Sequence, residues 1–157
     1  MVSAASLSAC GRYRYELTRV WAHEPLLTFV MLNPSTADAD KDDPTIRRCI
    51  GFAKRDGFGG LRVVNLFAFR ATQPTDMRAA DDPIGPENEA RLIELFSACG
   101  TFVAAWGAGG QFAGQASRVR SLADMFGVEL QCLGTTKDGY PRHPLYVKAD
   151  QPLVALV

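Results

Sequence analysis

The sequence predicts a single three-layer α/β domain, in which a central, mainly parallel sheet of about four strands carries helices on both faces and is extended by an N-terminal β-hairpin. Two observations favour this fold. Apolar runs of strand length alternate along the chain with amphipathic segments of helix length. The 157 residues also contain no repeat, linker or low-complexity segment, as is typical of one compact unit. We therefore expect one domain over residues 1–157.

The N-terminal part of the chain predicts two strands joined as a hairpin. Bulky and polar side chains alternate over Tyr13–Trp21, as they do in a strand with one exposed face. The segment His23-Glu24-Pro25 interrupts this alternation, and the apolar run Leu26–Leu32 follows it. We expect this run to pair with the preceding strand and to be the first strand of the parallel sheet.

Three segments have the apolar spacing and the end signals of amphipathic helices. The first begins after Asp43, a capping residue that a proline follows, and its apolar side chains recur at i, i+3, i+4 and i+7 until about Gly57. The second covers approximately Glu87–Cys99, where acidic residues suit the helix N-terminus. The third covers approximately Gln111–Phe126. Each of these helices would connect two strands.

Three further apolar runs predict the remaining strands, Leu61–Asn65, Thr101–Trp106 and Val128–Leu133. Right-handed crossovers through the helices make these strands parallel, so the loops that follow them meet on one edge of the sheet. The four loops on that edge read NPSTADADKDDP, NLFAFRATQP, WGAGG and GTTKDGYPRHP. They hold most of the candidate chemistry of the chain.

Composition and charge exclude several classes of protein. The 17 basic and 17 acidic residues cancel, so the chain lacks the global positive field of a protein that coats nucleic acid, and any contact with DNA must be local. No apolar run approaches the roughly 20 residues of a membrane span. The N-terminus lacks the basic leader and long apolar core of a secretory signal. We expect a cytoplasmic protein without a membrane partner.

The metal and cofactor motifs in the chain are incomplete. The acidic segment Asp38–Asp43 imitates the start of a calcium loop but lacks the glycine and the bidentate glutamate of such a loop, which leaves only magnesium open. The segment Trp106–Gly110 completes neither GxGxxG nor GxxxxGK. We predict no cofactor and no metal centre. The four cysteines form no CxxC pair and are expected to be small buried apolar side chains: Cys10, Cys49, Cys99 and Cys132.

Three polar residues in the predicted loops are the strongest candidates for a functional site. Asn33 and Asn65 end the apolar runs that precede them, and His143 lies in the late segment RHPLYV. Ligands of open α/β sheets bind at the carboxyl ends of the strands. An amide side chain there can read a ligand through its paired donor and acceptor groups. We predict that these three side chains converge.

The same loops supply further candidates. Ser35 lacks a GxSxG context, so we do not predict a nucleophile there. For phosphate contact we predict Arg47 on the outer face of the first helix, and Lys137 and Arg142 in the last loop. For substrate contact we predict a set of loop residues with polar, aromatic or loop-shaping side chains: Pro34, Ser35, Asn65, Phe67, Arg70, Trp106 and Tyr146.

These motifs carry a resemblance to known families. From about Arg12 to Val147 the chain resembles an uncharacterised family of mainly bacterial proteins, a domain of unknown function with the pattern LNPSTAD, DPTIRR, VVNLFAFRAT, AWG and HPLYV. More distantly, the order of motifs is similar to that of the uracil-DNA glycosylase superfamily. The shared order is an asparagine-proline loop after an apolar strand, a strand ending in asparagine, a strand ending in Trp-Gly, and a late histidine-proline.

The resemblance to uracil-DNA glycosylases implies a fold of that type and a role for each candidate. Asn33 would position or activate the attacking water, with Pro34 shaping the loop, and Asn65 would read the edge of the base. His143 would stabilise the negative charge on the departing base. The partner would then be DNA, a nucleoside or a nucleotide. Two departures are that the first loop has no stacking aromatic residue and that Leu145 stands where the superfamily has serine.

The chemistry of N-glycosidic cleavage suits these residue types. The reaction develops positive charge on the sugar and negative charge on the base, so a site needs a positioned water on one side and hydrogen-bond donors on the other. A base in a duplex must first be flipped out, which costs a few kcal/mol. The leading hypothesis is therefore a glycosylase-like hydrolase that acts on a base in DNA or on a related nucleoside.

Structural roles compete with these functional ones. Asn33 before a proline also suits a simple turn, Asn65 can tie loops together, and His143 can be a structural hydrogen-bond partner. Two alternative functions follow. One is a noncatalytic nucleotide- or nucleic-acid-binding module, which the neutral charge and the missing stacking aromatic favour. The other is a protein-interaction domain without a small ligand.

Overall fold

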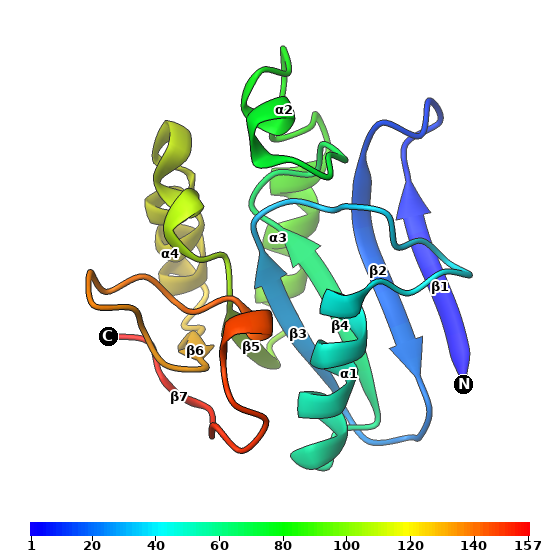
Figure 1. Ribbon diagram of the computed structural model, residues 1–157, viewed down its shortest axis with the longest axis vertical. Coiled ribbons are helices and arrows are strands. Elements are labelled where there is room, and N and C mark those ends of the chain that lie inside the picture. Colours follow the sequence, from blue (N-terminus) through cyan, green and yellow to red (C-terminus); the bar gives the residue numbers. More distant parts are fainter.

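The computed structural model describes all 157 residues and contains one mixed sheet of seven strands with helices on both faces (Figure 1). The strand order is β1-β2-β4-β3-β5-β6-β7. The central strands β4, β3, β5 and β6 are parallel to one another, and β1, β2 and β7 each pair antiparallel. The strands are β1 (Val2–Leu7), β2 (Arg14–Val20), β3 (Leu26–Met31), β4 (Gly60–Asn65), β5 (Thr101–Ala104), β6 (Gln131–Cys132) and β7 (Val154–Ala155).

The sheet is larger and more mixed than the sequence predicts. The predicted α/β class is confirmed, but the sheet has seven strands and half of its strand pairs are antiparallel, so the expected mainly parallel sheet of about four strands is not. The sequence did not predict the edge strands β1 and β7, because an edge strand with an exposed face needs no long apolar run. β1 reads VSAASL and is largely exposed, and β7 has only two residues.

The predicted hairpin between β2 and β3 is also wrong. β2 pairs with β1 on one side and with β4 on the other, so β4 separates it from β3. Both edges of β3 are occupied by parallel partners, β4 and β5, which leaves the outer edge of β4 as the place for β2. The N-terminal hairpin of the protein is formed by β1 and β2 instead.

The first predicted helix is confirmed. α1 spans Pro44–Arg55, and the side chain of Asp43 caps it by accepting a hydrogen bond from the backbone N–H of Ile46 at 2.8 Å. Its buried residues recur with helical spacing and include Phe52, whereas Ile50 is only partly buried. The local signals, a capping aspartate and a proline at the first helical position, were sufficient to predict where this helix begins.

The later helices are present with shifted ends. The last one begins after the predicted start because a short 3-10 segment precedes it, in which Ala113 has a positive φ of 55°. A short helix also forms inside the long loop after β4, where no helix was predicted. No helix of the protein has the length and apolar character that crossing a bilayer requires. These segments are α2 (Pro74–Arg78), α3 (Asn88–Ser97), η1 (Ala108–Gly114), α4 (Gln115–Met125) and η2 (Pro144–Tyr146).

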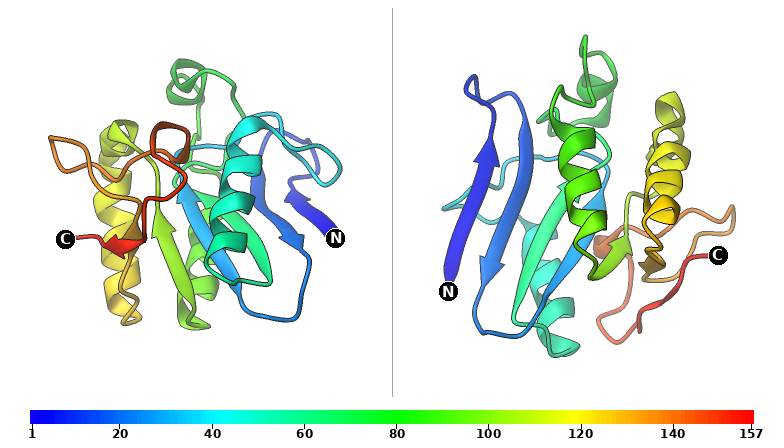
Figure 2. Two further views of the ribbon diagram at one scale, coloured as in Figure 1. Left: turned by 60° about the horizontal axis from the view of Figure 1, so that its bottom comes forward. Right: turned by 180° about the vertical axis from the view of Figure 1, so that it is seen from behind.

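The helices form two layers around the sheet. α1 covers one face, and α3 and α4 cover the other (Figure 2). Each face has its own hydrophobic core: Ile46 and Phe52 of α1 are buried on the first, and Phe96 of α3 and Leu122 of α4 on the second. Because the central strands are buried on both faces, their carboxyl ends are held firmly, and the loops that follow them start from a rigid edge.

Candidate functional site

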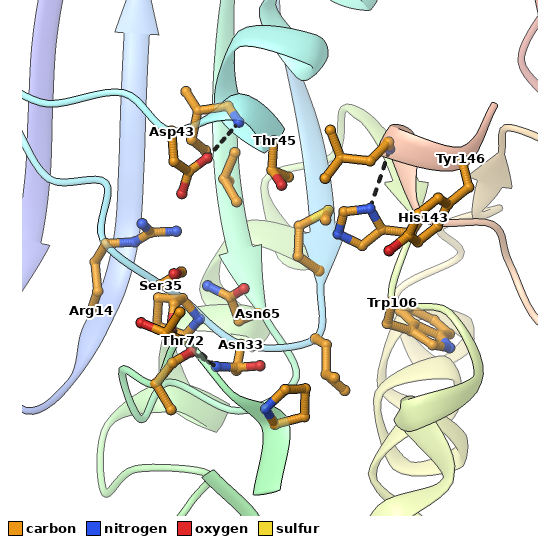
Figure 3. A pocket seen from close by; sticks show the side chains of 18 residues that line it. Arg14, Asn33, Ser35, Asp43, Thr45, Asn65, Thr72, Trp106, His143 and Tyr146 are labelled. Atoms are coloured by element: carbon orange, nitrogen blue, oxygen red, sulfur yellow. Dashed lines mark hydrogen bonds between the residues drawn. The ribbon is translucent and has the colours of Figure 1, made fainter. Parts of the chain in front are cut away.

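A cavity of about 340 Å³ lies at the carboxyl ends of β3 and β4, beside the N-terminus of α1 and the turn η2 (Figure 3). The loops that follow β3, β4 and β5 line it, together with the first residue of β2. Its volume is in the range of small-molecule sites. The sequence-predicted residues that the structure brings to this cavity are Asn33, Pro34, Ser35, Asn65, Trp106, His143 and Tyr146.

Asn65 ends β4 and contributes to the floor of the cavity. Its backbone is fixed on two sides: it is in register with Met31 of β3, and its carbonyl accepts a hydrogen bond from the side chain of Asn88 at 2.9 Å. Its side chain is only 1% exposed, yet neither its Nδ2 nor its Oδ1 has a hydrogen-bond partner. A buried amide without partners costs on the order of 1–3 kcal/mol for each unsatisfied group, so this side chain is suited to a polar ligand.

Asn33 joins two of the loops around the cavity. Its Nδ2 donates to the carbonyl of Ala71 at 2.8 Å and to that of Pro34 at 3.1 Å. No protein group donates to its Oδ1, so the amide has one structural end and one free acceptor. The structural alternative for Asn33 was a simple turn, whereas its amide nitrogen joins the loop after β3 to the loop after β4. The same side chain also leaves an acceptor for water or a ligand.

His143 presents one nitrogen to the protein and the other to the cavity (Figure 3). It caps η2, and its Nδ1 accepts a hydrogen bond from the backbone N–H of Leu145 at 3.2 Å. In the neutral ring Nε2 then carries the proton. Burial lowers the pKa of His143 below its ordinary value, and the nearby carboxylate of Asp43 opposes this shift only in part. The site thus holds a neutral imidazole that can donate a hydrogen bond.

Arg14 is the most important site residue that the sequence did not indicate. Arg14 and Leu17 are three residues apart and would face opposite sides of a regular strand. The pairing of β1 with β2 shifts register between Ser6 and Leu7, a β-bulge that re-aims the start of β2. Arg14 consequently lines the cavity on the α1 side, where Leu17 is also buried.

The guanidinium of Arg14 is incompletely satisfied. It is 2% exposed, one terminal nitrogen donates to the carbonyl of Ala37 at 2.9 Å, and Nε has no partner. Burial is the main reason that its pKa falls to about 10, and nearby Arg70 lowers it further, while Asp43 raises it. The group therefore still carries its positive charge at neutral pH.

Asp43 is the second site residue that the sequence did not indicate, because its role as a helix cap already accounted for an aspartate at this position. It is the only carboxylate that lines the cavity. One oxygen, Oδ1, is engaged as the cap of α1, and no hydrogen bond engages the other. A search of the sequence for acids near a predicted strand end could have found it, since Asp43 ends the loop that begins with Asn33.

Aromatic and apolar side chains form one wall of the cavity. Trp106 is almost fully buried, and its indole packs so closely on Gly110 that a Cβ at that glycine would lie 2.3 Å from the ring. This contact explains why residue 110 is a glycine. At the rim, Leu145 and Tyr146 are exposed, and the Tyr146 ring lies 5.5 Å from that of His143. The wall is therefore partly fixed and partly free to contact a ligand.

Two of the predicted substrate contacts lie outside the cavity. Phe67 is fully buried in the core on the other face of the sheet, with its ring 5.6 Å from that of Phe112. Strand alternation does not carry it to the side of Asn65, because β4 has already ended. Arg70 lines a neighbouring hollow with Arg12 and Lys41, and this hollow shares three residues with the cavity, namely Ser35, Ala71 and Thr72.

The predicted phosphate contacts are not brought to the cavity either. Arg47 is exposed on α1 and lines a separate hollow, while Lys137 and Arg142 are exposed in the loop before His143. Nε of Arg142 donates to the carbonyl of Thr135 within that loop. Basic residues on outer faces are usually solvated, and sequence spacing alone did not reveal which basic residue points inward.

The cysteines and acidic residues form no additional centre. Cys49 and Cys132 are buried, and burial raises the pKa of both thiols, but Cys10 and Cys99 are exposed, which corrects the expectation that all four are buried. No three His, Cys, Asp or Glu side chains are grouped in a way that could hold a metal ion.

Comparison with known proteins places the chain in a family. Residues 14–145 match the family model described as a protein of unknown function (DUF1643). Neither the curated proteins nor the solved structures yield a match. The matched segment begins at Arg14 and ends at Leu145, so it contains every residue that lines the cavity except Tyr146. The chain therefore belongs to the DUF1643 family.

Proposed function

We propose that the cavity recognises a nucleobase and that the protein hydrolyses the N-glycosidic bond of that base in DNA or in a related nucleoside or nucleotide. The observation that carries the proposal is the unpaired, buried amide of Asn65, which shares the cavity with Asn33 and His143. An amide pairs well with the edge of a base, because both present a donor beside an acceptor. The likeness to uracil-DNA glycosylases rests on the order of motifs alone.

The charges around the cavity suit this reaction. Water attacks C1′ of the sugar as the bond from C1′ to the base nitrogen breaks, and the base leaves with the bonding electron pair. His143 would donate its Nε2 proton as a hydrogen bond to the departing base. The free Oδ1 of Asn33 would orient the water, and Asp43 would stabilise the positive sugar and accept a proton from the water. The released base anion then takes up a proton.

The surroundings of the cavity suit a substrate that carries phosphate. The neighbouring hollow is lined by Arg12, Lys41 and Arg70 and contains the single acid Asp38. Basic side chains beside a base-sized cavity are what a nucleotide or a flipped DNA strand requires, although the whole chain has no net charge. The exposed Leu145 and Tyr146 at the rim are placed to contact a base or to fill the space that a flipped base leaves.

The test is a search for base release. The protein is incubated with single-stranded and duplex oligonucleotides that bear uracil, hypoxanthine or modified pyrimidines, and with the corresponding nucleosides and nucleotides. Abasic sites are detected by alkaline cleavage and free bases by chromatography. We expect release from at least one substrate. No release from any of them, together with no binding, would contradict the proposal.

Variants separate the proposed roles. Loss of a hydrogen-bond donor to a developing anion typically costs roughly 100- to 1,000-fold in rate, so we expect a loss of this order for His143→Gln. Asp43→Asn keeps a residue that can cap α1 and removes the charge, so it should slow release without unfolding the helix. His23→Gln is the matched control, because the other histidine is exposed and lies outside the cavity.

A noncatalytic binding module is the second candidate. One observation favours it: the Nδ2 of Asn33 is already engaged by two backbone carbonyls, as a purely structural residue would be. In that case a base or nucleotide binds without product, Asn65→Ala weakens binding, and Asn33→Ala affects only stability. A product peak that Asn33→Ala abolishes would exclude this alternative.

A further inference from the structure

The cavity contains a buried positive charge for which the protein supplies no adequate partner. None of the ion pairs of the protein involves Arg14, although this residue is only 2% exposed. Its Nε has no hydrogen-bond partner, and only one of its terminal nitrogens reaches a carbonyl, that of Ala37. A buried charge is stable only when it is paired and hydrogen-bonded.

The position of Arg14 makes this a feature of the cavity. β2 runs antiparallel to β4, so the start of β2 lies near the end of β4, and Arg14 lines the same cavity as Asn65 (Figure 3). The planar fork of a guanidinium matches the two oxygens of a phosphate or a carboxylate. Arg70 adds a second positive charge nearby, whereas Asp43 lines the cavity at the N-terminus of α1.

We propose that Arg14 binds an oxyanion group of the ligand, a phosphate or a carboxylate, so that the cavity selects an anionic ligand over its neutral counterpart. The inference deepens the proposed function, since it names the class of molecule that the same cavity takes. It does not depend on hydrolysis. If the ligand is a nucleotide, Arg14 reads its phosphate while Asn65 reads its base; if the anion is on the base itself, Arg14 reads a carboxylate.

The experiment compares matched pairs of ligands by calorimetry. Uridine 5′-monophosphate is compared with uridine, and orotate is compared with uracil. Hydrogen bonds to a charged partner favour the anionic member of a pair by roughly ten- to a hundredfold. In Arg14→Met, which keeps a long apolar stem, the anionic and neutral members of each pair should bind with about equal affinity. Arg62→Met is the control, because Arg62 is paired with Glu16 and lines none of the main cavity. It should keep the preference.

A measurement on the unmodified protein guards against a variant that fails to fold. The unpaired Nε–H of Arg14 is followed by NMR, assigned through its own side-chain correlations, during titration with inorganic phosphate and then with the preferred ligand. We expect a downfield shift of this proton that saturates with binding, and no shift in chloride at equal ionic strength.

The outcomes distinguish this inference from the proposed function. Equal affinity for the neutral and anionic members of both pairs, with an unmoved Arg14 resonance, would overturn it even if bases were released. Binding of anions that depends on Arg14, but without discrimination among bases and without product, would support it and count against the glycosylase. The pair that shows the preference identifies whether the oxyanion is a phosphate or a carboxylate.

Discussion

The two ends of β2 hold two buried arginines in opposite states. Arg19, 1% exposed, donates to the carboxylate of Asp42 at 2.9 Å and to four backbone carbonyls. Arg14, equally buried, donates to a single carbonyl and leaves Nε unpaired. Both side chains reach the loop between β3 and α1, so neither burial nor location in the fold explains the difference.

The charge of Arg19 stabilises the fold, whereas the charge of Arg14 is available to a ligand. Around Arg19 the loop supplies the acceptors for Nε and one terminal nitrogen, and strands β1 and β2 supply those for the other, so this guanidinium holds the loop against the sheet. Around Arg14 the same loop supplies only the carbonyl of Ala37, and a cavity remains beside the guanidinium. Protein interiors seldom leave buried polar groups unpaired, so a group that is unpaired and faces a cavity marks a site.

The largest expected effect is a loss of stability when Arg19, the fully paired arginine, is replaced. Arg19→Met leaves Asp42 and the carbonyls without their donor, and we expect a loss of about 3 kcal/mol in the free energy of unfolding. Arg14→Met removes few bonds, so its effect should stay within about 1 kcal/mol. Urea denaturation of both variants measures the difference. Equal losses would mean that Arg14 is as structural as Arg19.

A change of intermediate size is expected at two buried asparagines: neither polar atom of the Asn65 amide has a partner, whereas in Asn88 only Oδ1 has none. Asn65→Leu removes an unpaired buried amide, so it should raise the free energy of unfolding by roughly 1–2 kcal/mol while abolishing ligand binding. Asn88→Leu is the matched variant: its Nδ2 donates to two buried carbonyls, those of Asn65 and Leu66, so its replacement should be destabilising by a similar amount. Thermal unfolding with and without ligand gives both values, and destabilisation by Asn65→Leu would argue for a structural role.

The smallest expected effect is the pH dependence that His143 confers. Burial lowers its pKa in the folded protein, so the unfolded chain takes up the proton first as the pH falls. The contribution of neutral His143 to stability is therefore complete above the unfolded pKa of about 6.5 and is lost as the pH falls through the lower folded value. In His143→Gln this part of the acid dependence should disappear, and in His23→Gln it should persist. Denaturation midpoints between pH 5 and pH 8 provide the measurement.

Local signals were sufficient for several parts of this protein. The aspartate and proline before α1 predicted its start, because capping depends on neighbouring residues only. The apolar runs predicted β3, β4 and β5, which are buried on both faces. Since parallel strands end on one edge, the sequence also placed Asn33 and Asn65 near each other, and the structure puts both at one cavity with His143.

Tertiary structure alone decided the strand order, the edge strands and the chemistry of the cavity wall. Which strand lies beside β4 depends on the competition of all strands for free edges, and no local pattern records that competition. Arg14 enters the cavity only because a bulge changes the direction of its side chain and β2 lies against β4. Spacing along the chain specifies periodicity and caps, whereas the neighbours of a side chain depend on long-range pairing, and for that reason the unpaired arginine became visible only in the folded protein.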